Sequence, residues 1–200
     1  MCGRYDLSQN PAAIKAQFRV PSVPDFFLSP DVRPTEMKPI VRLDRDGGRE
    51  CVLARWGLVP SWAKDLKFGN RCINARAEGV ATTPSFRGGY ARRHCLVPLN
   101  AFFEWSGEKG HRIKWRIRLK DEPLFALAGL WEWWRDPATL QGIETYTIIT
   151  TGANAVIAPL HDRMPVIVGA PDYARWLDAG ADSKALLAPF ADEELLIEKA

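Results

Sequence analysis

The clearest pattern along the chain is the alternation of apolar and basic residues in HRIKWRIRLK, residues 111–120. Ile113, Trp115, Ile117 and Leu119 fall on one side of an extended chain, and the positions between them are Arg or Lys. A period of two predicts a half-buried strand with a basic outer face. Two interpretations of that face remain open: an edge strand charged against aggregation, or a stripe that faces phosphates.

Shorter apolar runs predict further strands, and a DRDGG turn separates two of them. The predicted strands are PIVRL (39–43), CVLARWGLV (51–59), CLVPL (95–99), FFEW (102–105), LFALAGLWEWW (124–134) and TYTIITT (145–151). The proline-rich segment 20–39 is expected to be irregular and extended. A loop of this length inside a domain is usually functional or disordered.

Helices are predicted to be few and short. Residues 9–18 form the first, with Ser8 as its N-cap. Thr83 or Ser85 caps a second that ends near Tyr90, and a third begins at Asn154. Three terminal helices are expected in PDYARWLDAG, DSKALLAPF and DEELLIEKA.

Length and composition fit one ordinary domain. The 200 residues are 46% hydrophobic and 26% charged, which is typical of a globular protein with an adequate core. The longest apolar runs fall short of the roughly 18 residues of a membrane span, and the N-terminus lacks the apolar core of a signal peptide. We therefore expect a cytoplasmic, α+β, strand-dominated single domain over residues 1–200.

The net charge of +3 is too small to indicate nucleic-acid binding by itself, so such a surface requires local clustering. Eight tryptophans is a high count, and a few of them are candidates for stacking on bases. The four cysteines lack zinc-site spacing. Cys51, Cys72 and Cys95 lie in apolar runs and are expected to be buried as small hydrophobes.

Cys2 stands apart because it directly follows Met1. Removal of Met1 leaves an α-amine and a thiol on neighbouring carbons, and such an aminothiol has two chemistries. It is a nucleophile with its own base, or it condenses with an aldehyde to give an imine and then a thiazolidine ring. The alternative is a chance cysteine in a short N-terminal strand.

Polar residues interrupt the apolar strand sequence at three further points. Glu104 lies between two aromatic residues, which suits a general acid/base with a raised pKa, although a salt bridge to an arginine would also explain it. His161 precedes a strand and suits a proton shuttle, or a capped core histidine. Asn74 opens NARAE. Arg76 and Arg163 suit phosphate or carboxylate recognition, or surface ion pairs.

Taken together, these motifs resemble the SRAP family (SOS-response-associated peptidase). Proteins of that family recognise abasic sites in single-stranded DNA and attach to them covalently through an N-terminal cysteine. The matching segments run in order along nearly the whole chain: MCGRY, RWGLVPSWAKD, NRCINARAE, PSFR, CLVPLNAFFEW, FALAGLWEWW, TIITTGAN and HDRMPV.

The resemblance implies catalytic roles. Cys2, exposed when the protein removes its own Met1, closes a thiazolidine with the ring-opened abasic aldehyde. Asn74 holds the Cys2 amine, and Glu104 is the general acid/base for ring opening and imine formation. His161 moves protons and holds the deoxyribose oxygen.

The resemblance also implies a DNA-binding surface. Three arginines clamp phosphates around a kinked strand, and Trp62 with Pro34 separates the bases that flank the lesion. The implied DNA contacts are Arg4, Pro34, Trp62, Arg76, Trp105 and Arg163. The implied fold is a compact β-rich domain, barrel-like with mixed or antiparallel sheets and a positive groove. The protein would act as a monomer without a cofactor or metal.

The chain departs from the family pattern at several places. Asp31 stands where Asn is usual, and a carboxylate beside DNA weakens the contact unless it faces away. Gly79 replaces a Thr and removes a helix cap, and Phe103 replaces a Tyr. The chain also ends at DEELLIEKA, without the usual C-terminal strand, so we expect either a truncation or a different closure of the sheet.

Two other functions remain open. A glutamine-amidotransferase-like amidohydrolase also begins Met-Cys-Gly, although Arg4 lies where such domains have an apolar residue. A non-catalytic single-strand-binding module would use the basic strand and the tryptophans.

Overall fold

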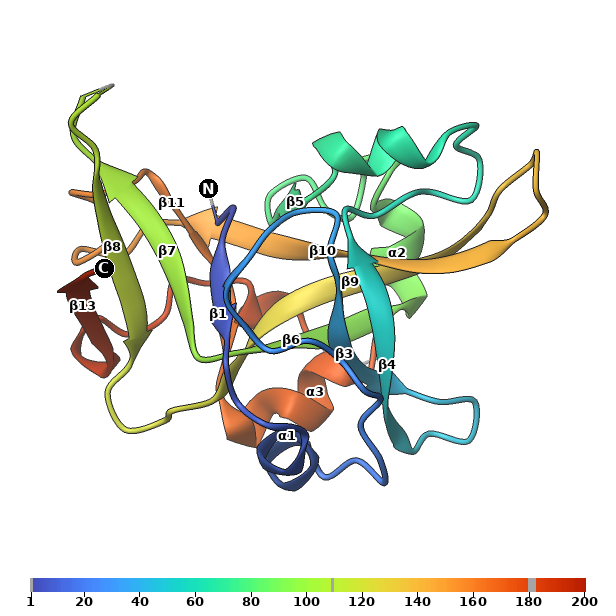
Figure 1. The fold of residues 1–200 in the computed structure, drawn as a ribbon, viewed down its shortest axis with the longest axis horizontal. Coiled ribbons are helices and arrows are strands. Elements are labelled where there is room, and N and C mark those ends of the chain that lie inside the picture. Colours follow the sequence, from blue (N-terminus) through green and yellow to red (C-terminus); the bar gives the residue numbers. More distant parts are fainter. Residues whose placement is uncertain (1, 109, 180–182) are drawn as a thin grey trace.

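Two β-sheets make up most of the structure, a computed structural model that describes residues 2–108, 110–179 and 183–200 (Figure 1). Neighbouring strands of the smaller sheet are antiparallel. In spatial order its strands are β13 (Leu195–Lys199), β8 (Ile113–Leu119), β7 (Ala101–Ser106), β1 (Tyr5–Leu7) and β2 (Ser29–Val32).

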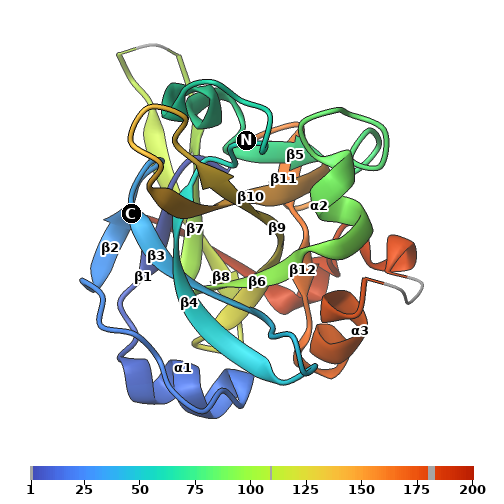
Figure 2. The ribbon, with the colours of Figure 1, turned by 90° about the vertical axis from the view of Figure 1, so that its right-hand side faces the viewer.

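The larger sheet curls into a closed barrel (Figure 2). Five strands form its wall: β3 (Met37–Leu43), β4 (Arg49–Trp56), β6 (His94–Leu99), β9 (Phe125–Arg135) and β10 (Gly142–Gly152). β3 pairs with β4 and β6, β9 pairs with β6 and β10, and β10 returns to β4 in parallel, so the ring has no free edge. Three short strands complete the sheet: β5 (Asn74–Arg76), β11 (Arg163–Pro165) and β12 (Ile167–Val168). The predicted β-rich, barrel-like α+β class is confirmed.

The helices in the described part of the chain are short. The α-helices are α1 (Pro11–Phe18), α2 (Arg87–Arg92) and α3 (Tyr173–Leu177), and the 3-10 helices are η1 (Leu66–Arg71), η2 (Ala170–Asp172), η3 (Lys184–Leu186) and η4 (Asp192–Glu194). α1 and α3 meet where the Phe18 and Tyr173 rings stack with centroids 5.1 Å apart. In Figure 1 these two helices lie below the sheets, whereas β5 and the start of β1 lie at the opposite end.

Two predicted helix caps are wrong. Asn10, not Ser8, caps α1, because its Oδ1 accepts a hydrogen bond from Ala13 N at 2.9 Å. The residue before α2 makes no side-chain cap. The Thr83 hydroxyl instead donates to the Gly79 carbonyl at 2.8 Å, within the preceding turn.

The C-terminal third departs most from the prediction. Residues 155–160 form turns instead of a helix, and the Asn154 side chain accepts from Ile157 N at 3.0 Å. DEELLIEKA forms η4 and then strand β13, because Leu195 and Ile197 complete the apolar side of β8. α3 and η3 confirm short helices in the two preceding segments, whose predicted spans also include residues 180–182, outside the described residues.

β13 also excludes one of the two interpretations of the basic strand. β8 lies between β7 and β13, so the edge-strand interpretation is wrong. Its cations are largely paired within the protein: Arg116 with Asp6 at 3.0 Å, and Arg118 with Glu198 at 3.3 Å. The chain therefore supplies its own final strand to the smaller sheet.

The core joins the two sheets through aromatic residues. Trp56 packs against Tyr5 of β1 and Tyr146 of β10, with centroid distances of 5.2 and 6.3 Å. The two tyrosine hydroxyls lie 2.8 Å apart in the buried interior. Cys51, Cys72 and Cys95 are buried free thiols, as predicted.

The tyrosine pair gives a test of this packing. Tyr146→Phe removes the hydrogen-bond partner of the buried Tyr5 hydroxyl. We expect this change to lower the unfolding free energy by about 1–3 kcal/mol. The double variant Tyr5→Phe/Tyr146→Phe removes both hydroxyls and should lose less than the sum of the single changes. Urea unfolding of the four proteins measures the coupling, and strictly additive losses would contradict it.

Candidate active site

Cys2 lies immediately before β1 and is fully buried. Its Sγ is 3.9 Å from the Arg4 carbonyl oxygen, and that carbonyl also accepts from Phe103 N on β7 at 3.0 Å. Burial raises the pKa of the thiol well above its ordinary range, and the neighbouring Glu104 carboxylate raises it further. At neutral pH the sulfur is therefore a thiol.

Strand β5 brings Asn74 to Cys2. β5 pairs in parallel with β10, with Asn74 opposite Ile148 and Arg76 opposite Thr150. Asn74 Nδ2 donates to the Cys2 carbonyl at 2.9 Å. Its Oδ1 is buried and has no hydrogen-bond partner within the described part of the chain. An acceptor thus lies ready beside the backbone of Cys2.

Glu104 enters the same site from β7 and is 3% exposed. Burial raises the pKa of its carboxyl, and the positive charge of His161 opposes the shift. Because Glu104 acts electrostatically on both the Cys2 thiol and His161, these three predicted residues share one site. A carboxyl whose pKa is raised by burial suits general acid/base work.

His161 lies just before β11, and its Nδ1 has two competing neighbours. The Arg163 backbone N–H donates to Nδ1 at 2.9 Å, which requires the neutral nitrogen. The Asp162 carboxylate lies 2.8 Å from the same atom, which favours a proton there. His161 Nδ1 thus contacts both a hydrogen-bond donor and a carboxylate, an arrangement that suits the predicted role in proton transfer.

The three arginines predicted to bind phosphates differ in whether their guanidinium groups already form ion pairs within the protein. The Arg163 guanidinium is paired with Glu78 at 2.5 and 3.0 Å and also donates to the Thr150 carbonyl at 2.6 Å. Arg76 is exposed and has no ion-pair partner among the residues that the structure describes. Arg4 is paired with Asp31 at 2.5 Å. Arg76 is thus the clamp most accessible to a new anion.

Pro34 and Trp105 lie on the flank that Arg4 occupies. Pro34 follows β2, and the next residue, Thr35, has a φ of +79°, which a β-branched residue rarely adopts. Strained backbone of this kind collects at ligand sites. Trp105 continues β7 beyond Glu104, with Lys114 Nζ 5.9 Å from its ring centroid.

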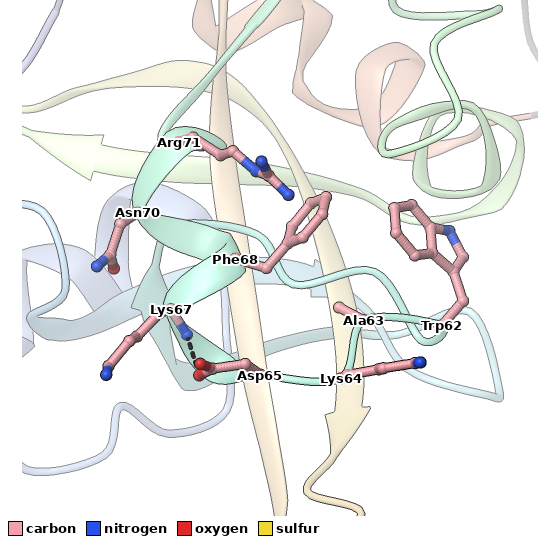
Figure 3. Close-up of a pocket in the computed structure, with 8 residues that line it drawn as sticks. All are labelled: Trp62, Ala63, Lys64, Asp65, Lys67, Phe68, Asn70 and Arg71. Atoms are coloured by element: carbon pink, nitrogen blue, oxygen red, sulfur yellow. Dashed lines mark hydrogen bonds between the residues drawn. The ribbon is translucent and has the colours of Figure 1, made fainter.

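Trp62 lines a separate hollow of about 700 Å³ around η1 (Figure 3). Its side chain is 56% exposed and meets the Phe68 ring edge-on at 5.0 Å. The Arg71 guanidinium lies 3.9 Å from the Phe68 ring centroid. Lys64 and Lys67 also line the hollow, so aromatic surface and positive charge are combined. η1 leads directly into β5, which connects this hollow to the segment that carries Asn74.

Sequence reasoning missed the acidic partners of the clamps and half of the Trp62 hollow. Glu78 carried a signal, because it follows Arg76 inside NARAE. Phe68 and Arg71 lie in a stretch without recognisable periodicity. Asp31 stands out in the sequence only as a departure from the family pattern. Of its three cationic neighbours, Arg33 is two residues away, whereas Arg4 and Lys114 come from distant segments.

Two negative findings apply to the residues that the structure describes. They contain no cluster of three or more His, Cys, Asp or Glu side chains suited to holding a metal ion. None of their helices combines the length and apolar character needed to cross a bilayer.

Comparison with known proteins places the chain in a family. The profile described as "SOS response associated peptidase (SRAP)" matches residues 1–199. The chain is 38% identical to the abasic site processing protein YoqW of Bacillus subtilis over 181 residues, covering 89% of this chain and 80% of YoqW. It is 36% identical to the abasic site processing protein YoaM of the same organism over 207 residues, covering 98% and 88%.

A solved structure has the same fold. A crystal structure of a protein from Bacteroides thetaiotaomicron superimposes with a TM-score of 0.90 at 28% identity, covering 99% of this chain and 91% of that one. Sequence and fold agree over essentially the whole length. The chain belongs to the SRAP family.

Proposed function

We propose that this protein processes abasic sites in DNA by forming a covalent thiazolidine crosslink through Cys2 on single-stranded DNA. Membership of the SRAP family and the names of its relatives support the abasic-site role. The observation that carries the chemistry is the position of Cys2, buried beside Asn74 and coupled electrostatically to Glu104. The protein would act as a monomer in the cytoplasm, on the nucleoid.

The first step is removal of Met1 by the protein itself. Water cleaves the peptide bond between Met1 and Cys2, giving free methionine and a Cys2 α-amine. The unpaired Asn74 Oδ1 is suited to accept a hydrogen bond from that amine, while Nδ2 already binds the Cys2 carbonyl. Two contacts from one amide would fix the direction of the amine lone pair.

The second step joins the amine to the sugar. Glu104 in its acid form gives its proton to the ring oxygen of the abasic deoxyribose. The bond between that oxygen and the anomeric carbon breaks, and the anomeric hydroxyl loses its proton to water, which leaves the open aldehyde. The amine adds to the aldehyde carbon, and loss of water gives an imine. The thiol then adds its sulfur to the imine carbon and its proton reaches the nitrogen, which closes the five-membered ring.

His161 would move protons between these steps. Its Nδ1 lies between a backbone donor and the Asp162 carboxylate, so gain and loss of a proton are both supported. Its positive charge would also favour the ionised form of Glu104 after proton transfer. We assign it to holding the deoxyribose oxygen, to proton movement between steps and to the reverse reaction.

Single-stranded DNA would bind along both sides of Cys2. Arg76 and Arg163 take phosphates on the β5–β11 side, and Arg4, Pro34 and Trp105 contact the strand on the β1–β7 side. Trp62 would stack on a base next to the lesion, in the hollow it shares with Phe68. An abasic position has no base to unstack, so bending the strand there costs little.

The covalent step is tested with an oligonucleotide that carries one abasic site. Wild type is expected to give an adduct that survives heating in denaturant, with the mass of the two components less one water. Cys2→Ala should give none. Cys2→Ser keeps the amine and should give only a hydrolysable imine. Glu104→Ala should slow adduct formation by about 10²–10⁴-fold, as loss of a general acid does.

Mass spectra of the adduct, a glutamine-hydrolysis assay and a DNA-binding assay distinguish the proposed function from an amidohydrolase and from a non-catalytic binding module. An undiminished adduct with Cys2→Ala would overturn the assignment of Cys2. Glutamine hydrolysis without an adduct would indicate an amidohydrolase. Salt-sensitive binding of single-stranded DNA, with equal affinity whether or not an abasic site is present and with no adduct, would indicate a non-catalytic binding module.

The raised pKa of Glu104 is tested by measuring the unfolding free energy of the protein as a function of pH. Its pKa in the folded protein is raised above the unfolded value, so the folded state binds the proton more tightly. Stability from this group is present below about pH 4.5 and is lost as pH rises through the folded pKa. The unfolding free energy of Glu104→Gln should therefore increase relative to that of wild type as the pH rises. The increase is about 1.4 kcal/mol for each tenfold difference between the acid dissociation constants of Glu104 in the folded and unfolded states. Urea unfolding at several pH values measures this, and a difference independent of pH would refute it.

The Trp62 contact is tested by affinity. Trp62→Ala should weaken binding to a single strand by about tenfold or more, because stacking on one base is worth about 1–3 kcal/mol. Adduct formation at saturating protein should be retained. Trp133, 49% exposed on β9, provides the matched control, and Trp133→Ala should leave affinity unchanged. Equal losses in both variants would argue against a specific stacking site.

A further inference from the structure

Asp31, near the end of β2, is the centre of a cluster of cations. Its Oδ2 lies 2.5 Å from Arg4 Nη1 and 3.2 Å from Arg33 Nη2, and its Oδ1 lies 3.4 Å from Lys114 Nζ. Three cations around one carboxylate leave two positive charges without compensation in this cluster. The carboxylate accepts from all of them, as a phosphate oxygen would.

The three cations come from separate parts of the chain. Arg4 follows Cys2 by two residues, Arg33 lies within the proline-rich segment next to Pro34, and Lys114 comes from β8. Their convergence requires β2, β1, β7 and β8 to be assembled. The cluster is thus a product of the fold and not of local sequence.

The surroundings of this cluster are those of a strand-binding surface. Lys114 Nζ lies 3.7 Å from the Phe103 ring centroid and 5.9 Å from that of Trp105. Phe103 precedes the catalytic candidate Glu104. Arg4, Pro34 and Trp105, three of the proposed DNA contacts, therefore all belong to the flank around Asp31.

The carboxylate is charged and within reach of solvent. Partial burial opposes ionisation, but Lys114, Arg33 and Arg4 outweigh it and hold the pKa of Asp31 below its ordinary value. The side chains of Asp31, Arg4 and Lys114 are each 30% exposed, so a phosphate can approach the same donors. Carboxylate and phosphate would compete for one set of cations.

We propose that Asp31 is a specificity-determining residue that occupies the place of a DNA phosphate and lowers the affinity of the protein for undamaged single strands. The inference rests on the proposed function, because it takes DNA as the ligand. A phosphate of undamaged single-stranded DNA must displace the Asp31 carboxylate before it can pair with Arg4 and Lys114. Undamaged DNA then forms no covalent bond that would offset this cost. At an abasic site the crosslink makes capture irreversible on the timescale of binding, so weaker initial affinity is tolerated.

The test is Asp31→Asn, which keeps the shape and removes the charge. With an unmodified single strand, fluorescence anisotropy should show binding about three- to tenfold tighter than wild type at low salt, since each released cation is worth a fraction of a kcal/mol to about 1 kcal/mol. Between about 50 and 200 mM salt the slope of log K against log salt should steepen by about 0.7 for each cation transferred to phosphate. Asp31→Glu should restore the wild-type affinity and slope.

Glu198 on β13 provides a matched control. Its carboxylate also pairs with two cations of β8, Arg116 at 3.7 Å and Arg118 at 3.3 Å, on the side of the sheet remote from Asp31's strand β2. Glu198→Gln should leave both affinity and salt slope unchanged. An equal gain in Glu198→Gln would mean that net charge alone is responsible and would overturn the role of Asp31.

The remaining outcomes separate this inference from the proposed function. Unchanged or weaker binding by Asp31→Asn, with wild type still forming the adduct on an abasic oligonucleotide, overturns the role of Asp31 alone. In that case the carboxylate positions Arg4 for the strand. No adduct and no strand binding by either protein overturns both proposals.

Discussion

Strand β1 contributes only three residues to the smaller sheet, yet both of its edges are paired, with β2 on one side and β7 on the other. This insertion fixes the start of the chain in the interior. It sets Cys2 within reach of the Asn74 amide and beside the carboxyl that β7 delivers. The Tyr5–Tyr146 contact then ties β1 to the barrel, so the strand that follows Cys2 is held by contacts with both sheets.

Burial gives the site its chemical character and also its cost. Cys2 and Glu104 are removed from water, which raises the pKa of both groups, and the Glu104 carboxylate raises that of Cys2 further. Because burial raises both pKa values, the site disfavours the charged forms of the two groups. Arg163 and Arg4 lie outside this pair, where Glu78 and Asp31 offset their charges.

The sequence predicted what depends on local pattern. Strict alternation identified β8, and apolar runs identified β6, β9 and β10. Motifs that flank strands brought Cys2, Asn74, Glu104 and His161 to attention. Pattern failed where tertiary pairing decides: β13 has helical composition but completes β8, and β2 forms in a proline-rich segment because β1 needs a second neighbour. The partners of Asp31 and Arg163 could not be read from the chain, since they lie up to 85 residues away.

The shortest functional element has a consequence for how such a protein can change. In β5 the side chains alternate, so Asn74 and Arg76 face the site while Ala75 between them is fully buried. A shift of the strand by one residue would turn both polar groups into the core at once. Under the proposed function, the contact of Asn74 with Cys2 and the contact of Arg76 with a DNA phosphate therefore depend on the same strand register. A substitution could alter one of them alone only if it left the register of β5 unchanged.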